Sequence, residues 1–242
     1  MNRKGASSVI QLNKVGAIFI KQIKDTLKDT QVLVLYIVYP LLGFIMVTAI
    51  APQVGEENFF IKIFASMHMV FLPIVATASV VAEEKEKSTL KVLMLANVKP
   101  ITYLIGVGSF IFLGTHIGTL CFAIMGKWSG GSFVSFIMNM MLGSICSMLI
   151  GFIVGLVAKN QMGATALTVP LGLVLSLFPM LSSFNTSIEK IAKITYSQQI
   201  SYLISKPSLR MYTLEQGAII GINLLLVFII FFSVYRKQFR EV

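Results

Sequence analysis

Six long runs of apolar residues limit what this chain can fold into more than any other feature of its sequence. A run of about 20 apolar residues is long enough to cross the hydrocarbon core of a bilayer as a helix, and a helix pairs all of its backbone groups internally. The runs lack the two-residue alternation of barrel strands. We therefore expect an all-α integral membrane protein, a single domain over 1–242, with six transmembrane helices at 32–50, 60–82, 101–125, 133–158, 164–184 and 218–235.

The composition excludes most other classes of protein. Only 12% of the residues are charged and 56% are hydrophobic, whereas soluble domains carry about 25% charged residues. Two cysteines are too few for a disulfide scaffold. In a membrane protein, a net charge of +10 is more typical of cytoplasmic loops and of contact with anionic lipids than of nucleic-acid binding. We expect membrane lipids as partners and no nucleic acid.

The distribution of lysine and arginine predicts a multi-pass topology with both termini in the cytoplasm. Of the 20 Lys and Arg residues, 14 then lie inside, and the six outside are Lys62, Lys127, Lys190, Lys193, Lys206 and Arg210. The first 30 residues carry scattered lysines rather than a compact basic start before a short apolar core. We therefore expect no cleavable signal peptide, and the first run to act as its own insertion signal.

Residues 8–30 are predicted to form an amphipathic helix rather than a span. Leu12, Val15, Phe19, Ile23 and Leu27 recur at steps of three and four and so share one helical face. The polar positions of this segment include Lys14, Lys21, Lys24, Lys28 and Asp29. A basic helix of this kind lies in the membrane interface, where its lysines meet lipid phosphates or a cytosolic partner. A simple topology anchor is the alternative.

The segment 83–100, between the second and third runs, is highly charged at its start. Five consecutive charged residues begin where the second run ends: Glu83, Glu84, Lys85, Glu86 and Lys87. A short helix is predicted next, with Leu90, Leu93 and Met94 on one side, and Pro100 ends it. A charged turn followed by an amphipathic helix can transmit a push from a cytosolic protein. A solvated loop that fixes topology is the alternative, and composition alone favours it.

The segment 185–216, before the last run, is apolar but too interrupted for a span, and Pro207 divides it. We expect one or two short helices that dip back into the outer leaflet or cap the outer mouth of the bundle. Re-entrant backbone of this kind is tolerated where protein or water covers its polar groups. A surface loop is an equal alternative.

Few polar residues lie inside the runs. Lys62, His68 and His116 are ionisable, and Asn139 and Asn223 could hydrogen-bond across helices. Each histidine is more simply a packing or hydrogen-bonding residue, because two histidines do not supply the three or four ligands of a metal site. The runs contain no acidic residue, which argues against an ion-driven antiporter.

Small residues in the fourth run predict close helix packing. Gly143, Ser147, Gly151 and Gly155 lie four residues apart, and this spacing lets helix backbones approach each other. Catalytic motifs are missing, including the phosphate-binding loop G-x-x-x-x-G-K-[ST], so we expect no enzyme and no ATP site in this chain.

Three stretches together resemble the permease subunits of type-2 ATP-binding-cassette (ABC) transporters. Residues 24–29 (Lys-Asp-Thr-Leu-Lys-Asp) and 39–42 (Tyr-Pro-Leu-Leu) look like the family's interfacial helix and first span. Residues 84–90 and 92–95 resemble its charged turn and coupling helix, and residues 178–202 are similar to its outer re-entrant helices. The likeness covers nearly the whole chain. It departs at Ser88, where the family commonly has Gly, and at Lys91, where an acidic residue is common.

The resemblance implies a division of labour between subunits. Two copies of a cytosolic P-loop ATPase would bind ATP and Mg, and this chain, with no cofactor of its own, would pair with a second permease chain, identical or a sister. Glu84 and Glu86 would make ionic contacts with the ATPase, and Leu90 and Leu93 would pack at the joint. The full set implied for coupling is Glu83, Glu84, Lys85, Glu86, Lys87, Thr89, Leu90 and Leu93, with Lys21, Lys24, Lys28 and Asp29 of the interfacial helix.

The implied activity is export across a bacterial plasma membrane by alternating access. The spans are rich in Met and Phe, and such surfaces adapt to varied hydrophobic ligands. We therefore expect an amphipathic or hydrophobic substrate, an antimicrobial peptide or a drug. The alternatives are a carrier or channel that works without an ATPase, and a non-transporting membrane sensor or assembly module.

Overall fold

The computed structural model describes residues 3–28, 30–54, 57–205, 207–208 and 212–240. Every regular element among these residues is helical, as the sequence predicts. The elements are α1 (Arg3–Thr26), α2 (Thr30–Ile45), the π-helical η1 (Met46–Ile50), α3 (Ala51–Val54), α4 (Glu57–Glu86), α5 (Thr89–Leu95), α6 (Pro100–Met125), α7 (Gly130–Val157), α8 (Gln161–Ser182), α9 (Thr186–Ala192), α10 (Tyr196–Ser205) and α11 (Leu214–Arg240).

Six of the described helices are long and apolar enough to cross a membrane, which confirms the six predicted runs. They cover Val32–Gln53, Asn58–Glu86, Pro100–Met125, Gly130–Val157, Gln161–Ser182 and Leu214–Phe239. The last span differs most from the prediction, since it extends four residues beyond 218–235 at each end, and the second span is also longer than predicted. We expected the second span to end at Ala82 and to be followed by a charged turn, but α4 continues as a helix through Glu86. The chain therefore has the architecture of a multi-pass membrane protein.

Helix α4 is the centre of the bundle. In its most apolar stretch 72% of the residues are buried, against 11% in the equivalent stretches of the first and last spans. Helix α7 packs against α4 through glycine: a Cβ on Gly151 would lie 2.7 Å from the Ile74 carbonyl oxygen, and a Cβ on Gly155 would lie 2.8 Å from Val81 Cβ. The small residues of α7 thus bring two helix backbones together, as their spacing predicts.

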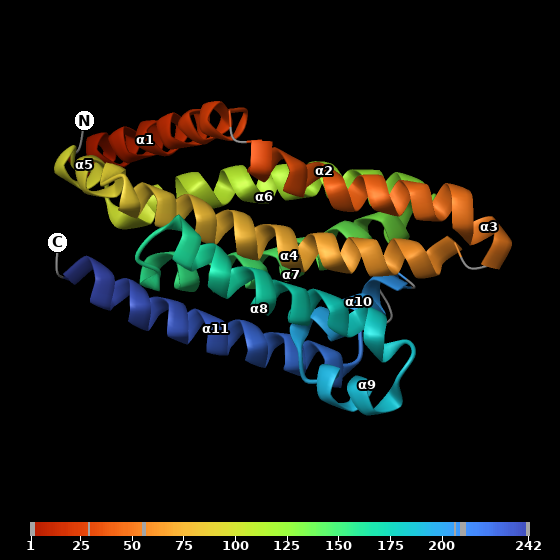
Figure 1. Ribbon diagram of the computed structural model, residues 1–242. Coiled ribbons are helices and arrows are strands. Elements are labelled where there is room, and N and C mark those ends of the chain that lie inside the picture. The colour runs from red at the N-terminus through yellow and green to blue at the C-terminus, as the bar shows by residue number, and fades with distance from the viewer. Residues whose placement is uncertain (1–2, 29, 55–56, 206, 209–211, 241–242) are drawn as a thin grey trace.

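The bundle has two distinct ends (Figure 1). Helices α1 and α5 lie at one end, where α11 also finishes, and α3, α9 and α10 lie at the other. The start of α1 and the finish of α11 lie at the same end of the bundle (Figure 1). We call this the α5 end, and the opposite one the α10 end.

Helix α1 packs beside the first half of α6. Gln11 contacts Thr102, a Cβ on Gly106 would collide with Ile18, and the rings of Phe19 and Phe110 lie 5.8 Å apart. The contacts advance in the same direction along both helices. The predicted apolar face of α1 is therefore divided, since Phe19 meets α6 while Leu12 and Leu27 remain 71% and 67% exposed.

Helix α10 is an internal element. Six of its side chains, from Tyr196 to Ser201, are buried without interruption. Tyr196 Oη lies 2.8 Å from Ser147 Oγ on α7, and Gln198 accepts a hydrogen bond from Ser182 on α8 at 2.8 Å. Helix α10 is therefore packed among the long helices and is not a simple surface loop, whereas most of α9, in the same segment, is exposed.

We predict that removing the Tyr196 hydroxyl costs less stability than removing the Ser147 hydroxyl to which it is hydrogen-bonded. Tyr196→Phe removes one interhelical hydrogen bond and should cost about 0.6 kcal/mol, and at most about 1.7 kcal/mol. Ser147→Ala should cost more, because it leaves a buried hydroxyl on Tyr196 without a partner. Reversible unfolding by SDS in mixed micelles measures both. A double variant whose cost equals the sum of the single costs would contradict a direct bond.

Candidate functional site

The charged end of α4 forms the most connected polar cluster at the α5 end. Glu84 is only 5% exposed, and its Oε1 accepts hydrogen bonds from Lys21 Nζ at 2.6 Å and from Gln22 Nε2 at 2.7 Å. Lys21 also pairs with Asp25 at 2.9 Å. A buried carboxylate on α4 is thereby bound to the polar face of α1.

Each neighbouring charge has a different partner. Lys85 Nζ donates to the carbonyl oxygens of Leu156 and of Ala158, the latter at 2.8 Å, and so closes the end of α7. A cation at the last carbonyls of a helix also complements its dipole. Glu86 accepts a hydrogen bond from the backbone nitrogen of Gln161, the first residue of α8, at 2.9 Å. We call Lys21, Gln22 and residues 83–87 the charged joint.

The electrostatics of the charged joint favour the charged forms of Lys21 and Lys87. Burial lowers the pKa of Lys21, but hydrogen bonds and charge from Glu84 and Asp25 outweigh this effect, so the net pKa is raised above its ordinary 10.5. Lys87 is exposed and pairs with Glu83 at 2.5 Å, one turn earlier on α4. That hydrogen bond raises the pKa of Lys87. Both lysines are therefore charged at neutral pH.

Helix α5 follows the charged joint after a tight turn. Ser88 has a left-handed backbone, with φ 57°, a conformation that favours glycine. Leu90 is 7% exposed and packs in the core, whereas Val92 and Leu95 are 61% and 84% exposed. Helix α5 thus has a buried face against the bundle and an apolar face turned outward.

The far end of α5 is bound to α1. Lys14 Nζ donates to the carbonyl oxygens of Ala96 at 3.0 Å and Asn97 at 2.8 Å, and Gln11 Nε2 donates to Asn97 at 3.2 Å. Asn97 is left-handed, with φ 57°, and asparagine tolerates this conformation better than most residues. Helix α1 therefore contacts both α4 and α5.

We predict that Ser88→Gly stabilises the turn between α4 and α5. A positive φ is sterically unfavourable for serine but not for glycine. The greater conformational freedom of glycine in the unfolded chain offsets part of this benefit, so the free energy of unfolding should rise by about several tenths of a kcal/mol. Ser88→Val should destabilise the protein, because a β-branched residue is strained at this φ. Equal thermal midpoints for the two variants in detergent would contradict this.

The remaining predicted residues divide into three groups. Thr89 is half-buried, and Leu93 is partly buried and packs against the same core as Leu90. Lys24 and Lys28 are exposed and form no ion pair with another residue of the described chain. Asp29 lies outside the described residues.

The polar candidates inside the spans do not converge. His68 is fully buried and its Nε2 lies 2.9 Å from the Thr115 carbonyl oxygen, whereas His116 bonds Phe112 on its own helix at 2.6 Å. Asn139 accepts a hydrogen bond from Tyr212, and Asn223 donates to the Ile194 carbonyl, at 3.0 and 2.9 Å. These contacts match hydrogen-bonding roles, and the described residues contain no group of three or more His, Cys, Asp or Glu that could hold a metal.

Lys62 belongs to a separate cluster at the α10 end. Its Nζ lies 5.9 Å from the centre of the Tyr202 ring, and Tyr202 Oη donates to Glu189 at 2.7 Å. Glu189 is on α9 and Tyr202 on α10, so Lys62 helps to join these two short helices to α4.

Three members of the site are not predicted from the sequence: Gln11, Gln22 and Gln161. Gln22 is 2% exposed and lies one turn from the buried Ile18 and Thr26. Ile18, Gln22 and Thr26 are spaced four residues apart, and this spacing was the available signal that they share a buried face. That face differs from the predicted apolar face, which contains Leu12, Val15, Phe19, Ile23 and Leu27.

No protein-family model matches the sequence, and no curated protein matches it either.

Proposed function

We propose that this chain is the membrane-spanning subunit of an ATP-driven exporter of the type-2 ABC kind. The observation that carries the proposal is the charged joint. It connects the chain just before α5 to the ends of several long helices through Glu84, Lys85 and Glu86. Glu84 is buried, and because a buried ion pair rarely adds stability, we attribute to it a role in transmission.

In this proposal the outward face of α5, with Val92 and Leu95, receives the ATPase. Leu90 and Glu84 then act inside the chain: Leu90 fixes α5 to the core, and Glu84 passes its displacement to α1. Lys85 and Glu86 pass the same displacement to α7 and α8. This arrangement changes the role that the resemblance implied for Glu84, from contact with the ATPase to transmission.

The proposed assembly contains two permease chains and two cytosolic ATPases. ATP and Mg are bound by the ATPases, and this chain supplies the substrate path. The α5 end and both termini lie in the cytoplasm of a bacterial cell, and α9 and α10 close the outer end. Helix α1 serves as the family's interfacial helix, with its lysines at the membrane surface.

A groove between α2, α4 and α8 is the substrate path that we propose. It has a volume of about 600 Å³ and is lined mainly by apolar side chains, including Phe71, Val75 and Met162. Ser79, Gln161 and Thr165 supply polar groups near the charged joint. Such a lining suits an amphipathic or hydrophobic substrate, an antimicrobial peptide or a drug, that moves outward.

The proposal is tested by changing the outward face of α5. Purification of the tagged chain from its native membrane in mild detergent is expected to recover a P-loop ATPase in stoichiometric amount. Val92→Asp/Leu95→Asp should abolish this recovery and the associated ATPase activity, because two charges replace the apolar contact. Leu214→Asp, at a residue that is 93% exposed in the last span, is the control and should retain the ATPase.

Two outcomes would contradict the proposal. A clean preparation without any ATPase would favour a carrier or channel that works alone, or a sensor or assembly module. An ATPase that stays bound to the Val92→Asp/Leu95→Asp variant would move the contact away from α5.

A further inference from the structure

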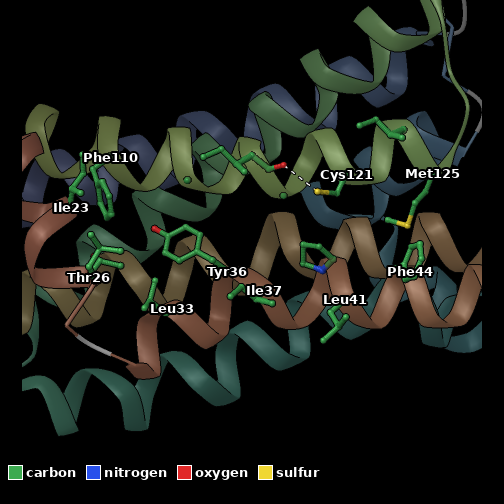
Figure 2. A pocket seen from close by; sticks show the side chains of 16 residues that line it. Ile23, Thr26, Leu33, Tyr36, Ile37, Leu41, Phe44, Phe110, Cys121 and Met125 are labelled. Carbon is green, nitrogen blue, oxygen red and sulfur yellow. Dashed lines mark hydrogen bonds between the residues drawn. The ribbon is translucent and has the colours of Figure 1, made fainter.

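An apolar groove runs along the outside of the bundle between α2 and α6 (Figure 2). Its volume is about 680 Å³. Ile23 and Thr26 of α1 lie at one end beside Phe110, Tyr36 and Ile37 lie in the middle, and Phe44 and Met125 lie at the other end (Figure 2). Both α2 and α6 are candidate spans, so the groove faces the interior of the bilayer.

The dimensions of the groove indicate its occupant. From Phe110 to Met125 α6 rises about 22 Å, at about 1.5 Å per residue. A volume of about 680 Å³ over this length gives a cross-section of about 31 Å², or about 6 Å across. An extended acyl chain fits, because one leaflet of the hydrocarbon core is about 15 Å deep.

The groove adjoins a polar cavity at the α5 end. This second cavity has a volume of about 700 Å³ and shares Thr26 with the groove. Charged residues of both signs line it, namely Lys21, Asp25, Lys28, Glu83, Glu84 and Lys87. Lys21 is paired with Asp25 and Glu84, and Lys87 is paired with Glu83.

Lys28 lines this cavity and has no ion pair within the described chain. Lys24, four residues earlier, lines neither cavity, but it is also exposed and has no ion pair with another described residue. The two flank Leu27, which lines the apolar groove. Lys21 is shared by Asp25 and Glu84, so the formal charges of the six residues that line the cavity sum to zero, and Lys24 adds one positive charge on the preceding turn. The apolar groove therefore leads toward two exposed lysines that have no ion pair within the described chain. This is the complement of a molecule with one long hydrocarbon tail and an anionic head.

We infer that this site holds one anionic phospholipid, with an acyl chain in the groove between α2 and α6 and its phosphate beside Lys24 and Lys28. The site is separate from the proposed substrate path, which lies between α2, α4 and α8, and it does not depend on an ATPase. Bound lipid would fill the space between α1, α2 and α6.

The test is native mass spectrometry of the full-length chain, delipidated in detergent and titrated with phosphatidylglycerol or phosphatidylcholine of identical acyl chains. The first phosphatidylglycerol should bind more tightly than the first phosphatidylcholine. Lys24→Gln/Lys28→Gln should weaken phosphatidylglycerol roughly 25-fold, about fivefold per lysine, and leave phosphatidylcholine unchanged. Lys159→Gln/Lys237→Gln, which removes two exposed lysines away from the groove, should change neither.

The groove itself is tested by a matched pair of variants on α6. Ile117 lines the groove and Leu113, one turn away, does not; both are exposed, at 69% and 53%. Ile117→Trp should weaken both lipids by filling the groove, and Leu113→Trp should weaken neither. Equal binding of the two lipids to the unmodified chain, an equal loss in the control lysine variant, or full binding to Ile117→Trp would each overturn the inference.

Discussion

A Gly151→Leu variant is expected not to fold. The Cβ of any residue at this position would lie 2.7 Å from the Ile74 carbonyl oxygen and 2.8 Å from Thr77 Cβ, both on α4. Backbone cannot move aside as a flexible side chain can, so the two central helices would have to separate. Gly151→Ala alone should cost about 1–3 kcal/mol, and leucine should abolish the contact between α4 and α7. Gel filtration after extraction in mild detergent should show aggregate in place of a single symmetric peak.

Two glycines provide the comparison for Gly151. At Gly221 on α11 a Cβ would meet nothing within 4 Å, so Gly221→Leu should give the same peak as the unmodified chain. At Gly143 a Cβ would collide with the Met69 side chain, which is flexible and can partly adjust. Gly143→Ala should therefore be milder than Gly151→Ala. A normal peak for Gly151→Leu would refute the close approach of the two backbones.

Replacement of Glu84 by alanine should have the second largest effect. The change removes the acceptor of two hydrogen bonds and leaves Lys21 and Gln22 without it. Breaking a fully buried ion pair costs about 3–5 kcal/mol. Because the Lys21 side chain is 33% exposed, we expect about 2–3 kcal/mol here. SDS unfolding in mixed micelles measures this loss, and transport should fail with it.

Glu83→Ala is the matched control for Glu84→Ala. Glu83 is one residue away and forms an exposed pair with Lys87 on the same helix, so its loss should cost about 0.3–0.5 kcal/mol. A double-mutant cycle of Glu84→Ala with Lys21→Ala should give a coupling energy well above that of Glu83 with Lys87. Equal costs for the two glutamates would show that burial of Glu84 contributes nothing.

The pH dependence of this pair has a defined sign. The pKa of Lys21 is raised above 10.5 in the folded chain, so its contribution is complete below that pH and is lost as the pH rises through the higher, folded pKa. Between about pH 6 and 9, titration of Lys21 should therefore cause no change in the difference in free energy of unfolding between Glu84→Ala and the unmodified chain.

The sequence predicted the long helices well because membrane spans are a local property. Each of the six needs only its own run of apolar residues, and the bounds of the third span, 101–125 against Pro100–Met125, differ by one residue. The small-residue pattern of α7 also predicted close packing, since Gly151 and Gly155 face α4 directly.

The charged joint could not be predicted in the same way. The pattern at residues 83–87 suggested that the helix stops where the charges begin, but α4 continues through Glu86, and Glu84, Lys85 and Glu86 each have a partner that is distant in the sequence. Gln22 is 62 residues from Glu84 in the sequence, and Leu156 is 71 residues from Lys85. No local pattern specifies such partners. The burial of α10 could not be predicted either, because the residues that cover it come from α4, α7, α8 and α11.

The bond between Glu86 and the start of α8 sets an order of events during synthesis. Gln161 follows Glu86 by 75 residues, and a ribosome that adds about 5–20 residues per second needs roughly 4–15 s to supply it. During that interval the C-terminal end of α4 has been synthesised, but the backbone nitrogen of Gln161 that will donate to Glu86 has not. Glu86 is exposed even in the finished structure, so water can hydrate its carboxylate during this interval. The contact between α4 and α8 at this end of the bundle forms only after four of the six spans have been made and the fifth has begun.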